Sequence, residues 1–217
     1  METIEKKRQL KKLAIRQIIL DTAKEIAAKE GWQQLTIRKI CTQINYSAPI
    51  VYQHFESKEM ILNCIREEGM TEMQAKIEQL QSKITEPSKQ LVAYALAFWH
   101  FSVAHPEIYQ VMFNLQGAIC KNEAKSSPVD HIHHCYKVAI KKLNTKANTS
   151  DKELLSLLDY YIAIIHGFIA LNMVKKIKSG VDKGEQVFNM SLKHFVNAIK
   201  DAEQHKGKKN SKLTKNK

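Results

Sequence analysis

The sequence contains few of the residues that interrupt helices, with only 7 glycines and 4 prolines among its 217 residues. No segment shows the regular alternation of apolar and polar residues that indicates a half-buried strand. Apolar residues recur instead at the spacing of helix turns along most of the chain. The pattern, together with the helix start and stop signals, predicts an all-α fold of about nine helices.

Cysteine and long apolar runs are also scarce. Four cysteines are scattered without a CxxC pair: Cys41, Cys64, Cys120 and Cys135. Three of them lie within helical patterns, which favours reduced thiols and a cytoplasmic protein. The N-terminal residues lack the apolar core of a signal peptide. The longest near-apolar stretch, 160–174, contains His166 and Asn172 and is too short and too polar to cross a bilayer, so we expect no membrane partner.

The formal net charge of +12 is concentrated at the two ends of the chain. Residues 1–16 hold six Lys or Arg against two Glu, and residues 201–217 hold six Lys against one Asp and one Glu, so each end carries a net +4. Basic ends suit a polyanion such as DNA. Two interpretations of residues 1–16 remain open: an arm that contacts DNA, or a solvated extension of the first helix. The Lys-rich segment 206–217 is predicted to be disordered.

The segment 36–62 carries the strongest local pattern. One apolar helix face is formed by Ile37, Ile40, Cys41 and Ile44, which lie at i, i+3, i+4 and i+7. Asn45 follows and tolerates the left-handed backbone that a sharp turn needs. Ser47 can cap a second short helix with Ala48, Val51 and Phe55 on its inner side. Two short helices joined by such a turn predict a helix-turn-helix, which places a helix in the DNA major groove.

The segment from Ile19 to Leu62 resembles the N-terminal domain of TetR-type transcriptional regulators. Its most specific string is Tyr-x-His-Phe-x-Ser-Lys-Glu at positions 52–59. Further family positions are occupied by Ile19-Leu20-Asp21-Thr22-Ala23, Gly31, Leu35-Thr36-Ile37, Ile40 and Ser47. Three positions depart from the family pattern: Asn45 stands for Gly, Cys41 for Ala and Ala27 for an aromatic residue. The resemblance implies a DNA-binding domain over residues 1–62 and a helical ligand-binding and dimerisation domain over residues 63–205.

A weaker resemblance covers part of the second half. The segments 98–101 and 105–109, with His166 and Gly167, are similar to a C-terminal domain named for a Trp-His-Gly motif. Ile165 stands where that motif has Trp.

The expected DNA contacts follow from the second short helix and its surroundings. Pro49 and Ile50 can pack on thymine methyl groups, and Gln53 can pair with adenine. The resemblance implies phosphate contacts from Tyr52 and Lys58, among others. The full expected set is Thr36, Arg38, Ser47, Ala48, Pro49, Ile50, Tyr52, Gln53, His54 and Lys58. Taken singly, several of these fit a small helical core or a solvated surface; their joint spacing favours DNA binding.

The resemblance also implies an effector pocket and a dimer. Candidate pocket residues are Trp99, His100, Tyr109, Phe113, Tyr136, Tyr161 and His166. The alternative is that most of them are ordinary core residues; such a pocket would suit a mostly apolar ligand with one or two polar anchors. Surplus apolar residues on the last two long helices predict a dimer interface. Candidate interface residues are Leu155, Leu158, Ile162, Ile169, Phe188, Leu192 and Phe195.

Other functions are less well supported by the sequence. His131, His134 and Cys135 lie at i, i+3 and i+4, but a metal site needs a further ligand, so surface imidazoles beside a packed Cys135 are favoured and no metal or cofactor is expected. No nucleophile, base and orienting group share a motif-like spacing, so we expect no enzyme. The leading hypothesis is a ligand-responsive repressor that binds a pseudo-palindromic operator as a dimer. The alternative is a helical interaction protein that binds DNA without sequence preference.

Overall fold

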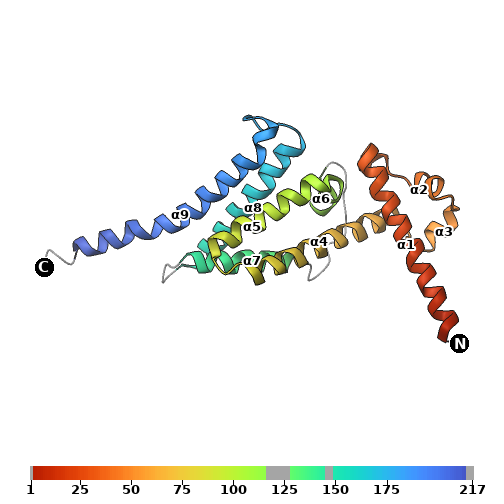
Figure 1. Ribbon diagram of the computed structural model, residues 1–217, viewed down its shortest axis with the longest axis horizontal. Helices are drawn as coiled ribbons and strands as arrows, with labels where there is room; N and C mark the ends of the chain where they lie inside the picture. Colours follow the sequence, from red (N-terminus) through yellow and green to blue (C-terminus); the bar gives the residue numbers. More distant parts are fainter. Residues whose placement is uncertain (1, 116–127, 145–148, 214–217) are drawn as a thin grey trace. The chain divides into compact units, whose positions relative to one another are not determined.

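The computed structural model of the protein describes residues 2–115, 128–144 and 149–213, with side chains from Ile4 to Lys200 except Val181. Within these ranges the chain forms nine α-helices and two short 3-10 helices and contains no strand, which confirms the all-α prediction (Figure 1). The elements are α1 (Glu2–Glu30), η1 (Trp32–Gln34), α2 (Ile37–Ile44), α3 (Ala48–Tyr52), α4 (Lys58–Lys83), α5 (Pro87–Ala104), α6 (Pro106–Met112), α7 (Pro128–Leu143), α8 (Asp151–Met173), η2 (Val181–Lys183) and α9 (Gly184–Leu213).

The helices divide into two compact units. Unit 1 comprises Met1–Thr71 and His105–Ser127, and unit 2 comprises Glu72–Ala104 and Pro128–Lys217. This division differs from the expected consecutive domains 1–62 and 63–205. Helix α4 contributes to both units, and α6 joins the N-terminal one, because a packed core is set by which helix faces meet and not by order along the chain.

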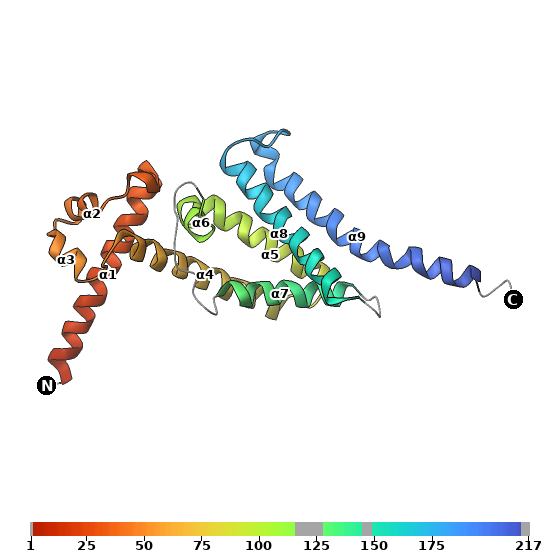
Figure 2. The same cartoon turned by 180° about the vertical axis from the view of Figure 1, so that it is seen from behind.

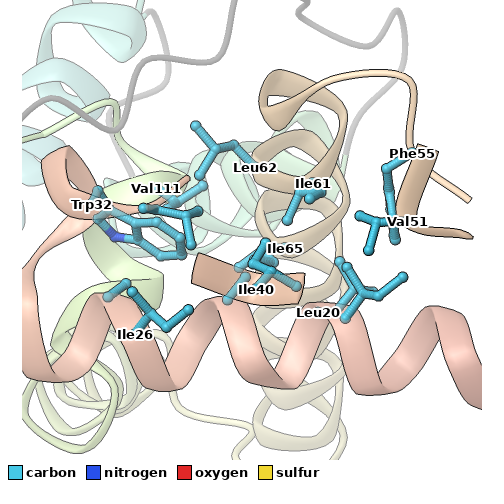
Figure 3. Packing of buried hydrophobic residues seen from close by; sticks show 14 residues of the cluster. Leu20, Ile26, Trp32, Ile40, Val51, Phe55, Ile61, Leu62, Ile65 and Val111 are labelled. Carbon is cyan, nitrogen blue, oxygen red and sulfur yellow. The ribbon is translucent and has the colours of Figure 1, made fainter. Parts of the chain in front are cut away.

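The core of unit 1 is built around α1. Its buried residues include Leu20 and Ile26 from α1, Ile40 from α2 and Ile65 from α4 (Figure 3). Val111 from α6 belongs to the same cluster and is fully buried. Each such side chain contributes about 1.5–3 kcal/mol through removal of apolar surface from water. This shared core holds the short helices α2 and α3, which are too short to be stable alone.

Unit 2 is a helical bundle in which α5 contacts α7, α8 and α9 (Figure 2). The hydroxyl of Tyr161 on α8 donates a hydrogen bond to the carbonyl oxygen of Leu91 on α5. Trp99 of α5 stacks on Phe188 of α9 with ring centroids 5.1 Å apart. Aromatic side chains therefore fill much of the space between α5 and the two long helices.

Several helix ends follow the local signals in the sequence. A capping box starts α8, with Ser150 and Glu153 bonding reciprocally to each other's backbone N–H. Helix α8 ends at Met173, before the next glycine of the sequence, Gly180. The helix stops early because Lys175 adopts a left-handed backbone with φ of 54°, and the N–H of Lys176 bonds back to the Leu171 carbonyl at 2.8 Å.

The last helix is longer than the composition predicts. Helix α9 continues to Leu213, so residues 206–213 are helical where disorder is expected, and residues 214–217 lie outside the described residues. Lysine is a good helix former, and extending an existing helix avoids the cost of nucleating one.

Candidate nucleic-acid interface

The helix-turn-helix is formed by signals that each act within about one helix turn. The Thr36 hydroxyl accepts a hydrogen bond from the backbone N–H of Lys39 at 3.2 Å and caps α2. Asn45 ends α2 in the left-handed conformation, at φ 55° and ψ 41°, as predicted. Ser47 takes an extended backbone before α3, but its side chain makes no capping hydrogen bond, contrary to the prediction. Pro49 lies in the first turn of that helix. These signals fix the direction in which α3 leaves the turn.

Helix α3 presents one buried and one exposed face. Val51 is fully buried, whereas Tyr52 keeps 51% of its surface exposed. Ala48, Pro49 and Gln53 are exposed, and Ile50 is half-buried. Pro49 and Gln53, two of the residues predicted to read bases, are thus exposed, whereas Ala48 is exposed although it was predicted on the inner side of α3.

Arg16 of α1 contacts both the segment that follows α3 and helix α4, a role that the sequence did not predict. Its Nη1 donates to the carbonyl oxygen of His54 at 3.0 Å, and its Nη2 lies 2.8 Å from the Cys64 sulfur. The same guanidinium lies 4.2 Å from the centre of the Phe55 ring, a cation–π contact. The only sign of this role in the sequence is the position of Arg16 beside the apolar face of α1. A solvated arginine would occupy the same position.

Lys58, expected at a phosphate, has an internal partner. Its Nζ donates to the carbonyl oxygen of Trp32 at 2.9 Å. Burial lowers the pKa of Lys58, an effect that Glu59 opposes. Lys58 thus holds η1 against the start of α4.

The first turn of α2 carries two basic side chains, Arg38 and Lys39, in different environments. Lys39 pairs with Glu30 at 2.5 Å, so its charge is compensated locally. Arg38 is exposed and forms no ion pair within the described part of the chain. Thr36 and Arg38 therefore remain accessible from solvent at the end of α2 where the helix dipole favours anions.

His54 lies in a positive environment at the end of the helix-turn-helix. Burial lowers its pKa most, and the charges of Lys12 and Arg16 lower it further. Its Nδ1 is buried without a hydrogen-bond partner among the described residues. Burial and these positive charges therefore disfavour the protonated form of the imidazole.

Helix α6 is fixed to unit 1 by two close approaches. The indole N–H of Trp32 donates to the carbonyl oxygen of Glu107 at 2.8 Å. On α4, a Cβ at Gly69 would lie 2.8 Å from both Ile108 Cγ2 and Met112 Sδ, so only glycine admits this packing. Helix α6 is thus packed into the same unit as the helix-turn-helix.

The predicted pocket residues fall in two different units. Tyr109 and Phe113 belong to unit 1 and lie with ring centroids 4.7 Å apart. His100 is exposed on unit 2, with its Nε2 3.2 Å from Glu185. Within unit 2, Tyr136 lies 4.9 Å from Tyr161 between ring centroids, and Tyr136 and His166 both contact Phe98. Trp99 packs on Phe188 instead.

The predicted dimer residues divide between core and surface. Four of the seven are buried within the protomer: Leu158, Ile169, Phe188 and Leu192. Ile162 and Phe195 are half-buried, and Leu155 is 49% exposed. Apolar spacing alone did not distinguish the face packed in the bundle from the face open to a partner.

The histidine and cysteine cluster on α7 is engaged with other residues. His131 Nε2 lies 3.1 Å from Glu78, and Cys135 Sγ lies 3.8 Å from the side-chain oxygen of Gln81. Among the described residues, no group of three His, Cys, Asp or Glu side chains could hold a metal ion.

Comparisons with known proteins agree with this geometry. Residues 19–65 match the family described as bacterial regulatory proteins, tetR family. No curated protein matches the sequence.

Solved structures share the fold. A Rhodococcus sp. RHA1 protein of unknown function aligns with TM-score 0.67 at 17% identity, over 84% of this chain and 94% of its own. A TetR transcriptional regulator from Streptomyces coelicolor aligns with TM-score 0.61 at 14% identity, over 86% and 97%. A TetR variant from Acinetobacter baumannii AYE in complex with minocycline aligns with TM-score 0.59 at 16% identity, over 85% and 95%.

At these identities the structural similarity shows the fold, while the family match lies on the residues that build the helix-turn-helix. Residues 19–65 therefore match the family of bacterial regulatory proteins named for tetR, and the described chain has the fold of a solved TetR regulator.

Proposed function

We propose that the protein is a cytoplasmic transcriptional repressor that binds a pseudo-palindromic operator as a homodimer and is released by a small, mostly apolar effector. The observation that carries the DNA-binding part is the exposed apolar face of α3. Tyr52 is half exposed beside a fully buried Val51, on a helix fixed by the core of unit 1. Such a face, presented by a helix-turn-helix, fits the edges of base pairs in the major groove.

Base reading and phosphate contact are assigned to different side chains. Pro49 and Ile50 pack on thymine methyl groups, and Gln53 pairs with adenine. Tyr52, Thr36 and Arg38 contact phosphates and set the register of α3 on the duplex. Lys58 has a structural role in this scheme, because the Trp32 carbonyl already accepts one of its hydrogen bonds.

The homodimer is supported by one long face of α8 that the described residues of the protomer leave uncovered. Tyr160 is 62% exposed, Leu171 45% and Val174 51%, and Ala163 and Gly167 are exposed between them. A Cβ atom added at Gly167 would have no heavy atom within 4 Å. Because this position is open and carries no side chain, a second helix can approach closely there. A second copy of the chain, packed as a helical bundle, would bury this face.

Helix α8 is also long and apolar enough to cross a membrane by length and composition alone, with a mean hydropathy of 1.8 and 28% of that window buried. A single such helix is weak evidence, because core helices of bundles meet the same criterion. Lys152, Asp159 and the capping box at its start favour a helix whose exposed face meets another protein.

The effector is supported by an unsatisfied group among the aromatic residues of unit 2. Tyr136 lies 5.9 Å from Tyr94 and 4.9 Å from Tyr161, measured between ring centroids. The Tyr94 hydroxyl is buried with no hydrogen-bond partner among the described residues. Leaving such a group unpaired costs about 1–3 kcal/mol, which a ligand with one polar atom and an apolar body would recover.

The deciding experiment is footprinting on the DNA that flanks the gene of this protein, followed by competition with random duplex DNA at physiological salt. A specific regulator protects a pseudo-palindromic site and prefers it about a thousandfold or more over random DNA. Equal affinity for both would instead support the alternative, a helical protein that binds DNA without sequence preference. Tyr52→Ala should weaken operator binding without changing the unfolding midpoint, because the side chain is half exposed.

A further inference from the structure

Helix α1 begins well before the family match. The helix starts at Glu2, whereas the matched residues start at 19. Residues 4–14, here called the α1 extension, are all exposed, and Ile15 is the first residue packed on the core of unit 1. The axial distance from Arg8 to the anchored Arg16 is roughly 12 Å, at about 1.5 Å per residue. Among the described residues of unit 1, the extension is therefore a helical segment that no other element covers.

One face of the extension is basic and borders α3. Arg8, Lys11 and Lys12 precede Ile15 at i, i+3, i+4 and i+7, so all four lie on one side of the helix. Together with Gln53 and His54 they line a groove of about 400 Å³. The residue proposed to read a base and the residue that ends the helix-turn-helix thus share a groove with three cationic side chains.

The charge of this groove is not neutralised internally. Its lining contains no acidic side chain, and Arg8, Lys11 and Lys12 form no ion pair within the described part of the chain. Glu5 lies instead on a neighbouring groove of about 470 Å³. The charges of Lys12 and Arg16 reach His54 strongly enough to lower its pKa, after the larger effect of burial. A groove of this kind attracts an anion.

We propose that this groove binds backbone phosphates of the same duplex that α3 reads, with Arg8, Lys11 and Lys12 as the phosphate ligands. The assignment rests on the proposed DNA-binding function. Gln53 belongs to both the groove and the base-reading face of α3. The sugar–phosphate strands that flank a base pair within reach of Gln53 therefore run past the groove. The extension thereby widens the DNA footprint beyond the domain that the family match covers.

Two charge-matched double variants test the assignment. Lys11→Ala/Lys12→Ala removes two charges from the groove, and Lys6→Ala/Lys7→Ala removes two charges from the same helix outside both grooves. All four positions are exposed, and alanine preserves the helix, so both proteins should fold with unchanged circular dichroism. Affinity for the footprinted operator is then measured as a function of salt concentration.

The groove variant should bind the operator on the order of tenfold to hundredfold more weakly at ~0.1 M salt, and its salt slope should fall in magnitude by about 1.8, or about 0.9 for each lost phosphate. The control variant should keep a slope close to that of the wild type. Equal changes in both variants would overturn the groove assignment, since net charge alone would then explain them. No change in either variant would overturn it as well.

A further experiment distinguishes two possible ligands of the groove, the phosphates of DNA and a small free anion. Operator binding is compared in chloride and in inorganic phosphate at equal ionic strength. Equal affinities support a site for the DNA backbone, whereas selective competition by inorganic phosphate assigns the groove to a small anion and overturns the proposal. If the wild-type protein shows no preference for its operator over random DNA, the proposed function itself fails, and this result is distinct from all outcomes above.

Discussion

Arg16 and His54, 38 positions apart in the sequence, are joined by a 3.0 Å hydrogen bond from the guanidinium to the backbone carbonyl oxygen. The second nitrogen of that guanidinium lies 2.8 Å from the Cys64 sulfur, and its face lies over the Phe55 ring. One side chain thus connects α1, the end of the helix-turn-helix and α4. The orientation of α3 depends on this connection, because α3 itself has only five residues.

Replacing Arg16 should therefore affect both stability and DNA binding. Arg16→Ala removes a charge-assisted hydrogen bond and a cation–π contact, and we expect the free energy of unfolding to fall by about 2 kcal/mol. Urea unfolding with an unchanged m-value measures this loss. Arg38→Ala is the matched control, because Arg38 is exposed and unpaired among the described residues and should change stability by less than about 0.5 kcal/mol. Equal stability of the two variants would contradict the anchoring role.

Lys58→Met distinguishes an internal contact from a phosphate contact. The variant keeps the apolar stem but removes the hydrogen bond to the Trp32 carbonyl, so stability should fall by about 1–2 kcal/mol. The salt slope of operator binding should stay unchanged, because no phosphate contact is lost. A slope reduced by about 0.9 would show instead that Lys58 contacts a phosphate.

Gly69→Ala tests the close packing of α6 on α4. The new methyl group would lie 2.8 Å from Ile108 Cγ2 and Met112 Sδ, and we expect a net loss of about 1–2 kcal/mol despite the better helix propensity of alanine. In a background of Ile108→Ala with Met112→Ala, the same change should become neutral or stabilising. Urea unfolding is measured for the wild type, the Gly69 variant, the Ile108/Met112 background and the combination of both, which gives the coupling energy. If the changes in unfolding free energy were strictly additive, the overlap at Gly69 would be relieved by other residues.

Leu171→Lys tests the dimer face on α8. Burying a lysine at a helix–helix contact is unfavourable, so the dimer dissociation constant should rise roughly tenfold to hundredfold. Val103→Lys provides the control, because Val103 is a similarly exposed aliphatic residue on α5, 56% against 45%. Light scattering after size-exclusion chromatography measures both. Dissociation of the Val103 variant alone would place the interface elsewhere.

His166 makes unit 2 sensitive to acid. Burial, with a smaller effect of His133, lowers the pKa of His166 to about 4. The unfolded chain therefore binds a proton there at higher pH than the folded protein does. Its contribution to stability is fully present above pH ~6.5 and is lost as the pH falls to about 4, by at most about 3 kcal/mol.

The His166→Gln variant removes this titration. Its stability should fall less steeply between pH ~6.5 and about 4 than that of the wild type, measured by urea unfolding at several pH values. Parallel pH profiles of the two proteins would show that His166 is accessible to protons in the folded state.

Features that depend only on residues close in the sequence could be predicted without the structure. The left-handed Asn45 is found as predicted, and the cap at Thr36 and the capping box at Ser150 likewise act within about one helix turn. Hydrophobic periodicity likewise predicted the all-α class, because the helix period is a local property.

Contacts between segments that are far apart in the sequence became visible only in the folded structure. It placed Lys58 on the Trp32 carbonyl, 26 positions away, and Trp32 itself on α6, 75 positions away. It also selected which apolar residues of α8 are buried, as Leu158 is, and which stay exposed, as Leu171 does. A periodic pattern gives the faces of a helix, whereas the neighbour that covers a face is chosen by the packing of the whole unit.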